Sequence, residues 1–125
     1  MAEDKKGGTA TGPVLPKDAK HLLYLNPGEE MVYHADGLLD DSVKGTLVLT
    51  NEKLFFYFES NISREQIFIG RHAFIVEAKL KEGFMSSELS IRNKKESFSI
   101  RKMKKDQARK FYGFLKDITE KNRSV

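Results

Sequence analysis

The side chains that could do chemistry in this chain are few, and their spacing assembles no catalytic site. The three histidines, His21, His34 and His72, lie far apart and lack the short spacing of paired metal ligands. No Gly-x-Ser-x-Gly motif marks a nucleophilic serine. The chain has no cysteine, which excludes thiol catalysis, disulfides and thiolate metal sites. We therefore expect no catalytic residues, no metal and no cofactor, and interpret the protein as a non-enzyme.

Two other stretches resemble ligand sites only superficially. Asp40 and Asp41 are adjacent, so on an extended strand their carboxylates would face opposite ways, and we interpret them as solvated turn residues. Gly7, Gly8 and Gly12 have the composition of a phosphate-binding loop. No strand precedes them, however, and the Gly-Lys-Ser/Thr ending is missing, so we predict no nucleotide site.

The distribution of charge says more about possible partners than any of these residues does. The chain carries a net charge of +4, but the charge is unevenly distributed. Residues 26–62 contain seven acidic and two basic side chains, whereas residues 92–112 contain nine basic and two acidic ones. Such asymmetry attracts anionic partners, although a basic surface can also serve solubility alone.

The elements that would position these charges are organised around residues 43–58. Leu47 and Leu49 alternate with Thr46, Val48 and Thr50, and this period of two predicts a strand. A second alternating run, rich in aromatic residues, covers 54–58. Asn51-Glu52 between the two runs predicts a tight hairpin turn.

Shorter alternating runs predict further strands on either side, over 30–38, 67–69, 74–80, 89–91 and 98–100. Asp106 to Asn122 changes to a helical period, with an apolar stripe that predicts an amphipathic helix covering the sheet. Phe84-Met85 is an apolar pair in a predicted loop, which either packs into the core or stays exposed. We expect a disordered tail over 1–15, a short helix opening at Pro16, one domain over 16–121 and frayed residues at 122–125.

The order of these elements resembles the pleckstrin-homology superfold, in particular its bacterial PH and GRAM branches. The resemblance rests mainly on the string G-T-L-V-L-T-N-E-K-L-F-F-Y-F, Gly45 to Phe58. Gly28-Glu29-Glu30, Ile67 to Ile69 and the helix residues Ala108, Phe111 and Leu115 add to it, and the likeness covers Leu25 to Ile118. It implies a mainly β fold, in which a strongly bent antiparallel sheet of about seven strands forms a barrel capped by the C-terminal helix.

The resemblance also implies a binding module. Relatives that bind phosphoinositides strongly carry spaced basic residues in the loop between the first two strands, but here residues 38–42 contain two aspartates and Lys44 is the nearest base. We therefore expect a protein partner and an adaptor role, with weak binding to anionic membrane lipid as the alternative and nucleic-acid binding as the least favoured. The expected location is the cytoplasm, with the inner face of the membrane as the alternative.

Two groups of basic residues are the candidate sites. In the related fold the strand 3–4 and 6–7 loops should lie together at one end of the barrel, and the lipid-binding candidates there are Arg64, Arg92, Lys94 and Lys95. The candidate partner-binding region follows the last strand and comprises Arg101, Lys102, Lys104, Lys105 and Arg109. The predicted core comprises Leu47, Leu49, Leu54, Phe56, Phe58, Leu89, Ile91, Phe98, Ile100, Phe111, Phe114 and Leu115.

Overall fold

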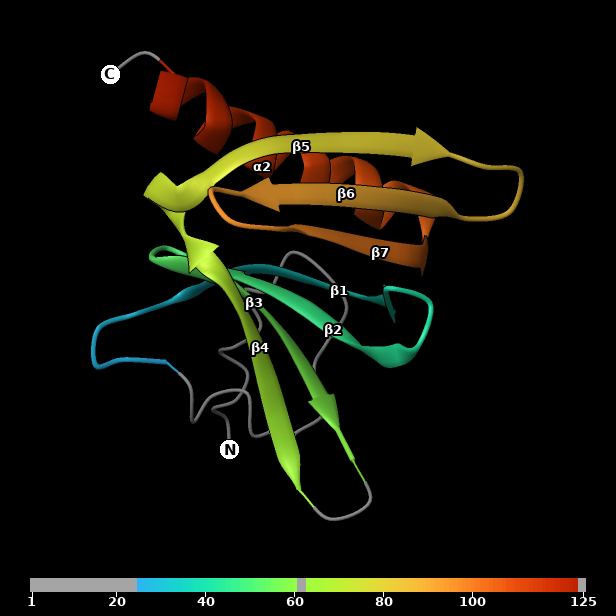
Figure 1. Ribbon diagram of the computed structural model, residues 1–125, viewed down its shortest axis with the longest axis horizontal. Helices are drawn as coiled ribbons and strands as arrows, with labels where there is room; N and C mark the ends of the chain where they lie inside the picture. Colours follow the sequence, from blue (N-terminus) through green and yellow to red (C-terminus); the bar gives the residue numbers. More distant parts are fainter. Residues whose placement is uncertain (1–24, 61–62, 124–125) are drawn as a thin grey trace, which may run out of the picture.

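The computed structural model describes residues 25–60 and 63–123 (Figure 1). The predicted tail over 1–15 and the predicted helix at Pro16 lie outside these ranges. Seven strands form one antiparallel sheet in the order β4-β3-β2-β1-β7-β6-β5. The elements are β1 (Met31–Leu39), β2 (Val43–Thr50), β3 (Lys53–Glu59), β4 (Arg64–Arg71), η2 (His72–Phe74), β5 (Ile75–Glu82), β6 (Ser87–Asn93), β7 (Ser97–Met103) and α2 (Lys105–Arg123).

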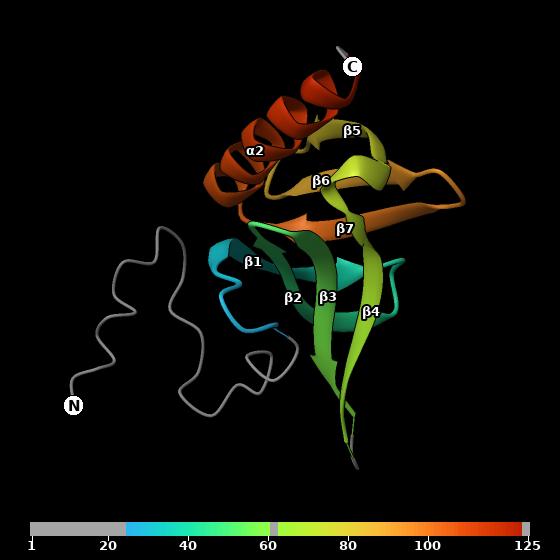
Figure 2. The same cartoon turned by 90° about the vertical axis from the view of Figure 1, so that its left-hand side faces the viewer.

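The sheet bends strongly, and α2 covers one side of the half made by β5, β6 and β7 (Figure 2). This confirms the predicted mainly β architecture with a capping C-terminal helix. The expectation of a barrel is wrong, because β4 and β5 follow one another in the chain yet form the two opposite edges of the sheet. The short 3₁₀ helix η2 joins them without pairing them.

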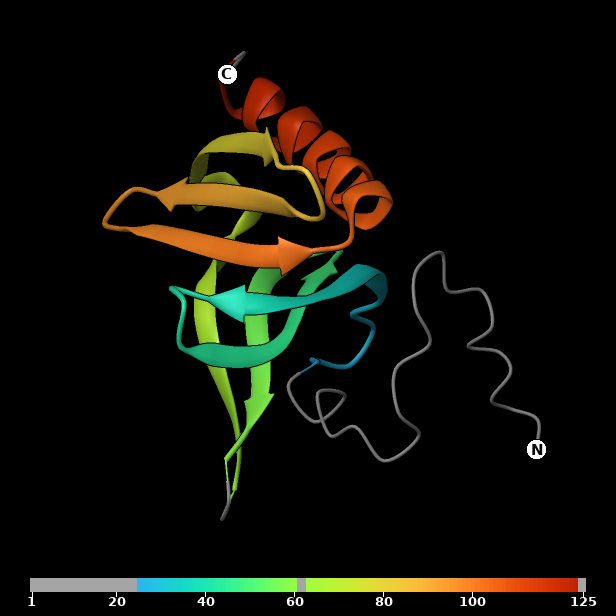
Figure 3. The same ribbon diagram turned by 90° about the vertical axis from the view of Figure 1, so that its right-hand side faces the viewer.

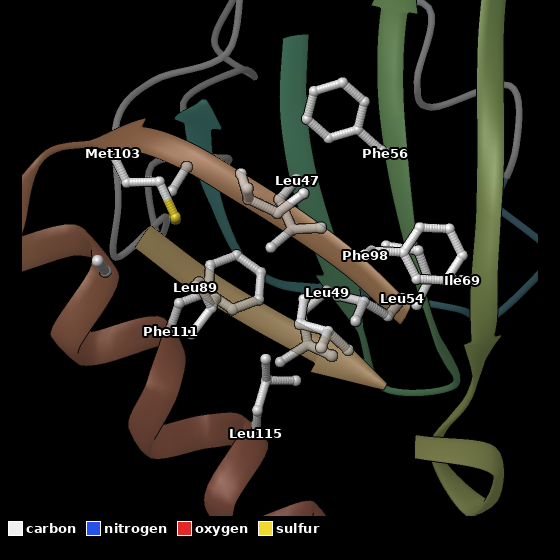
Figure 4. Close-up of a cluster of buried hydrophobic side chains, with 14 of the residues drawn as sticks. Leu47, Leu49, Leu54, Phe56, Ile69, Leu89, Phe98, Met103, Phe111 and Leu115 are labelled. Carbon is white, nitrogen blue, oxygen red and sulfur yellow. The ribbon is translucent and has the colours of Figure 1, made fainter. Parts of the chain in front are cut away.

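The core lies between the bent sheet and α2 (Figure 4). Ten of the twelve predicted core residues are buried, and Phe58 and Phe114 are partly buried against the same cluster. Tyr33 on β1 meets the helix edge-on, with its ring centroid 5.5 Å from that of Phe111. The sequence predicts fraying from residue 122, but α2 continues to Arg123. Its last turn is held in place because Asn122 Nδ2 donates hydrogen bonds to the carbonyls of His72 and Ile75 at 2.7 and 2.9 Å.

Two glycines that face each other across β1 and β2 allow neighbouring segments to approach closely. Gly45 pairs with Gly37 across β1 and β2. A Cβ atom on Gly45 would lie 2.2 Å from the carbonyl oxygen of Tyr57, and one on Gly37 would lie 2.5 Å from a side-chain carbon of Ile100. Contacts this short are not tolerated, so both positions require glycine for the strands to cross closely.

Two of the sequence segments that carry the resemblance, Gly28-Glu29-Glu30 and Gly45 to Phe58, meet at the β2–β3 turn. Glu29, whose side chain is buried, accepts a hydrogen bond from the Thr50 hydroxyl and one from Lys53 Nζ at 3.1 Å. Thr50 Oγ1 in turn accepts from the backbone N–H groups of Glu52 and Lys53, both at 3.0 Å. Burial opposes ionisation of Glu29, but the hydrogen bonds and the Lys53 charge outweigh it and lower the pKa of Glu29. The network therefore locks the start of β1 to the hairpin.

Candidate binding surface at the β5–β6 turn

The first group of predicted site residues is not brought together. Lys94 and Lys95 lie in the β6–β7 turn, while Arg64 begins β4 at the end of a hairpin that projects away from that turn in Figures 1 and 3. Arg92 Nε donates to Glu77 at 3.1 Å, and Lys94 Nζ lies 5.1 Å from the centre of the Phe74 ring. The expectation that the two loops lie together is therefore wrong, because the sheet stays open.

The second group does cluster, at the end of β7 and the start of α2. Its arginines are used in ion pairs, since Arg101 contacts Asp41 at 2.9 Å and Glu88 at 3.8 Å. Arg109 holds Glu82 through two hydrogen bonds of 2.7 and 2.9 Å. The bonds from Arg109 lower the pKa of Glu82. In contrast, Lys102 and Lys104 are the exposed lysines of this group. Within the described part of the chain, neither has a carboxylate within ion-pair distance.

Backbone geometry sets the direction of Lys102. Its φ of +57° lies in the left-handed region, which is uncommon for a residue with a side chain. The register of β6 and β7 shifts here, since Ser87 pairs with Met103 but Leu89 with Ile100. This is a β-bulge, and bulges redirect the side chains that they carry. The strained position places the Lys102 side chain on the surface at the end of β7.

Next to these lysines lies an apolar pair that is almost fully exposed. Phe84 and Met85, here called the apolar tip, occupy the β5–β6 turn, which Gly83 N–H closes by donating to the Ser86 carbonyl at 2.8 Å. Their side chains are 94% and 84% exposed. The apolar pair of the predicted loop therefore stays outside the core.

Both ends of the β5–β6 turn approach the basic group. Ser87 pairs with Met103, and Figures 1 and 3 show the turn beside the start of α2. Between the turn and β7 lies a hollow of about 360 Å³, lined by Asp41, Lys81, Glu82, Gly83, Ser86, Ser87, Glu88, Arg101 and Lys102. We use the name basic shoulder for the bases that line this hollow or follow it at the start of α2: Lys81, Arg101, Lys102, Lys104, Lys105 and Arg109.

The sequence pattern identified most residues of the basic shoulder but missed Lys81. It did not decide whether the apolar tip is buried or exposed. Lys81 belongs to β5, so its place beside Lys102 depends on sheet pairing across β6 rather than on nearness in sequence. A usable signal was present, because an apolar pair directly after Gly83 and before Ser86 leaves little chain with which to fold back into the core.

Apart from the hollow beside the tip, the described residues contain a further hollow but no cluster of metal ligands. A second hollow, of about 400 Å³, lies on the outer face of β5 to β7 and is lined by Ser90, Ser97 and Ser99 together with the Glu77–Arg92 pair. No group of three or more potential metal ligands occurs within 25–60 and 63–123. Among the same residues, no helix combines the length and apolar character needed to cross a membrane.

Comparison with known proteins places this architecture in a family. A search of curated proteins finds no match. Among solved structures, the pleckstrin homology (PH) domain of USP37 has a similar fold, with a TM-score of 0.55 at 17% identity. The match covers 70% of this chain and 97% of that one. The bacterial PH domain family matches residues 25–117, which is most of the chain and the whole sheet. The chain belongs to the bacterial PH domain family.

Proposed function

We propose that the protein is a non-catalytic binding module that attaches to an anionic surface through the basic shoulder. One observation carries this proposal: three carboxylates that line the hollow are already paired with arginines, whereas Lys81 and Lys102 beside them are not. Asp41 and Glu88 contact Arg101, and Glu82 contacts Arg109. In the described chain, Lys81, Lys102 and Lys104 have no such carboxylate, so their charges remain available to a partner.

Electrostatics favours this end of the molecule over the one predicted from the resemblance. At the β6–β7 turn, Arg92 is paired with Glu77 and Lys94 lies over the Phe74 ring. Exposed lysines that converge from two strands and a helix start raise the local positive potential, which attracts anionic partners and speeds their association. An acidic protein surface, as an adaptor would use, and a bilayer of anionic lipid both supply the matching charge.

Retention on heparin, a polyanion, tests this shared chemistry. The shoulder variant is Lys102→Glu with Lys104→Glu, and the matched control is Lys94→Glu with Lys95→Glu, which makes the same change in net charge at the β6–β7 turn. We expect the shoulder variant to elute at clearly lower salt than the control. Equal shifts for the two variants would mean that net charge alone governs retention, and the proposed surface would be wrong. Circular dichroism of each variant checks that the fold is intact.

A further inference from the structure

We propose that the anionic surface is a lipid bilayer and that Phe84 and Met85 insert into it while the basic shoulder contacts the headgroups. This inference rests on the proposed function. It starts from the apolar tip, whose two side chains are 94% and 84% exposed. Large exposed apolar groups have a cost in water that is removed only when a partner covers them.

The shape of the tip favours a bilayer over a protein pocket. Phe84 and Met85 stand at the end of a turn closed by the Gly83–Ser86 hydrogen bond, so they form a protrusion and not a groove. The hollow beside them is lined by charged residues, serines and a glycine. It therefore provides no apolar surface on which a hydrophobic helix of a partner could pack. A short apolar protrusion needs only a soft apolar medium, and the boundary between headgroups and acyl chains provides one.

The charges around the tip have the arrangement that interfacial binding requires. Lys81 approaches from β5 and Lys102 from β7, and both line the same hollow behind the tip. Their long side chains can keep the ammonium groups among the headgroups while the tip lies deeper. Each basic residue near an anionic surface adds attraction, and stable anchoring takes two signals together. Here the apolar tip is one signal and the lysines are the other.

The other exposed aromatic residues do not share this setting. Phe68 on β4 is 52% exposed, and Phe74 in η2 is 46% exposed with Lys94 above its ring. Phe68 therefore provides a control, because it is a partly exposed aromatic residue on β4 and not in the β5–β6 turn. The chain contains no tryptophan, so a single introduced indole reports on one position without background.

Sedimentation with vesicles tests the inference in the full chain. Vesicles of phosphatidylcholine are compared with vesicles of phosphatidylcholine and phosphatidylglycerol, an anionic lipid without an inositol headgroup. We expect binding to the anionic vesicles only. Phe84→Ser with Met85→Ser should weaken that binding by about tenfold or more, since two apolar side chains lose their burial. Phe68→Ser should leave it unchanged, and the tip variant should elute from heparin like the wild type.

Insertion itself is tested with Phe84→Trp, with Phe68→Trp as the control. Anionic vesicles should shift the indole emission of the Phe84→Trp variant to shorter wavelength and leave that of the control unchanged. Shoulder-dependent heparin retention combined with absent or tip-independent vesicle binding would overturn this inference and leave the proposed function standing, with an acidic protein surface as the partner. Shoulder-independent heparin retention would overturn the proposed function itself.

Discussion

At the scale of single residues, His34 is a titratable side chain whose complete burial the sequence does not reveal. It is 1% exposed on the outer face of β1, opposite Val48, and neither ring nitrogen has a hydrogen-bond partner among the residues described. Burial lowers the pKa of His34 below its ordinary value of 6.5, and the nearby charge of Asp36 opposes this only in part. The fold therefore favours the neutral imidazole of His34 over its charged form.

This burial predicts a loss of stability in mild acid. The unfolded chain takes up a proton at His34 before the folded one does, so the contribution of His34 is complete above about pH 6.5 and declines as the pH falls below that value. The contribution of His34 to stability is measured by urea unfolding of the wild type and of His34→Leu at pH 7.5 and 5.5. The wild type should lose more stability between the two pH values than the variant, which no longer titrates there. Equal losses would show that His34 is not protonated on unfolding.

Lys102 shows a conflict between stability and binding at one residue. Its left-handed backbone favours glycine, and a β-branched side chain is the least tolerated there. We expect Lys102→Val to be about 1 kcal/mol less stable than Lys102→Gly in urea unfolding, and both to be retained less strongly on heparin than the wild type. Equal stabilities would mean that the bulge relaxes to accept the valine.

At the scale of elements, strand parity was predictable because alternation alone decides which side chains face the core. Phe56 is fully buried, opposite Leu47 on β2 and Ile67 on β4. Phe56→Ala should therefore cost about 3–5 kcal/mol in the free energy of unfolding, as the removed ring leaves a cavity. Phe58→Ala, at a partly exposed position of the same parity, should cost less. A loss below about 1 kcal/mol for Phe56→Ala would contradict the parity.

Other features of the elements could not be read from alternation. Val48, Phe55 and Tyr57 point away from the main core, yet they are buried in a second cluster with Leu25 and Met31 packed against it. A single strand pattern cannot show whether its second face is covered as well. Likewise, the Glu29–Thr50 contact joins residues 21 positions apart, and only the pairing of β1 with β2 brings them together.

At the scale of the whole molecule, the succession of strands and helix along the chain follows from the sequence pattern, but the arrangement of the loops depends on how the sheet bends. The closing helix and the basic region after β7 were predictable from local patterns, and a binding module was what the family resemblance implied. The separation of Arg64 from Lys94 was not, because it follows from β4 and β5 remaining unpaired edges. The exposure of Phe84 depends similarly on where β5 and β6 end, since the two strands leave only Gly83 to Ser86 between them.

The uneven charge of the molecule leads to a prediction about salt. Exposed charges are screened over about 8 Å at physiological ionic strength, and over shorter distances as salt increases. Attraction of the shoulder lysines to anionic vesicles should therefore fade with added NaCl, whereas the contribution of Phe84 and Met85 should not. Vesicle binding by the wild type should fall toward that of Lys102→Glu with Lys104→Glu until the two coincide, and the tip variant should stay weaker than the wild type throughout. A difference between wild type and shoulder variant that persists at high salt would mean that these lysines make direct, desolvated contacts instead of acting through their field.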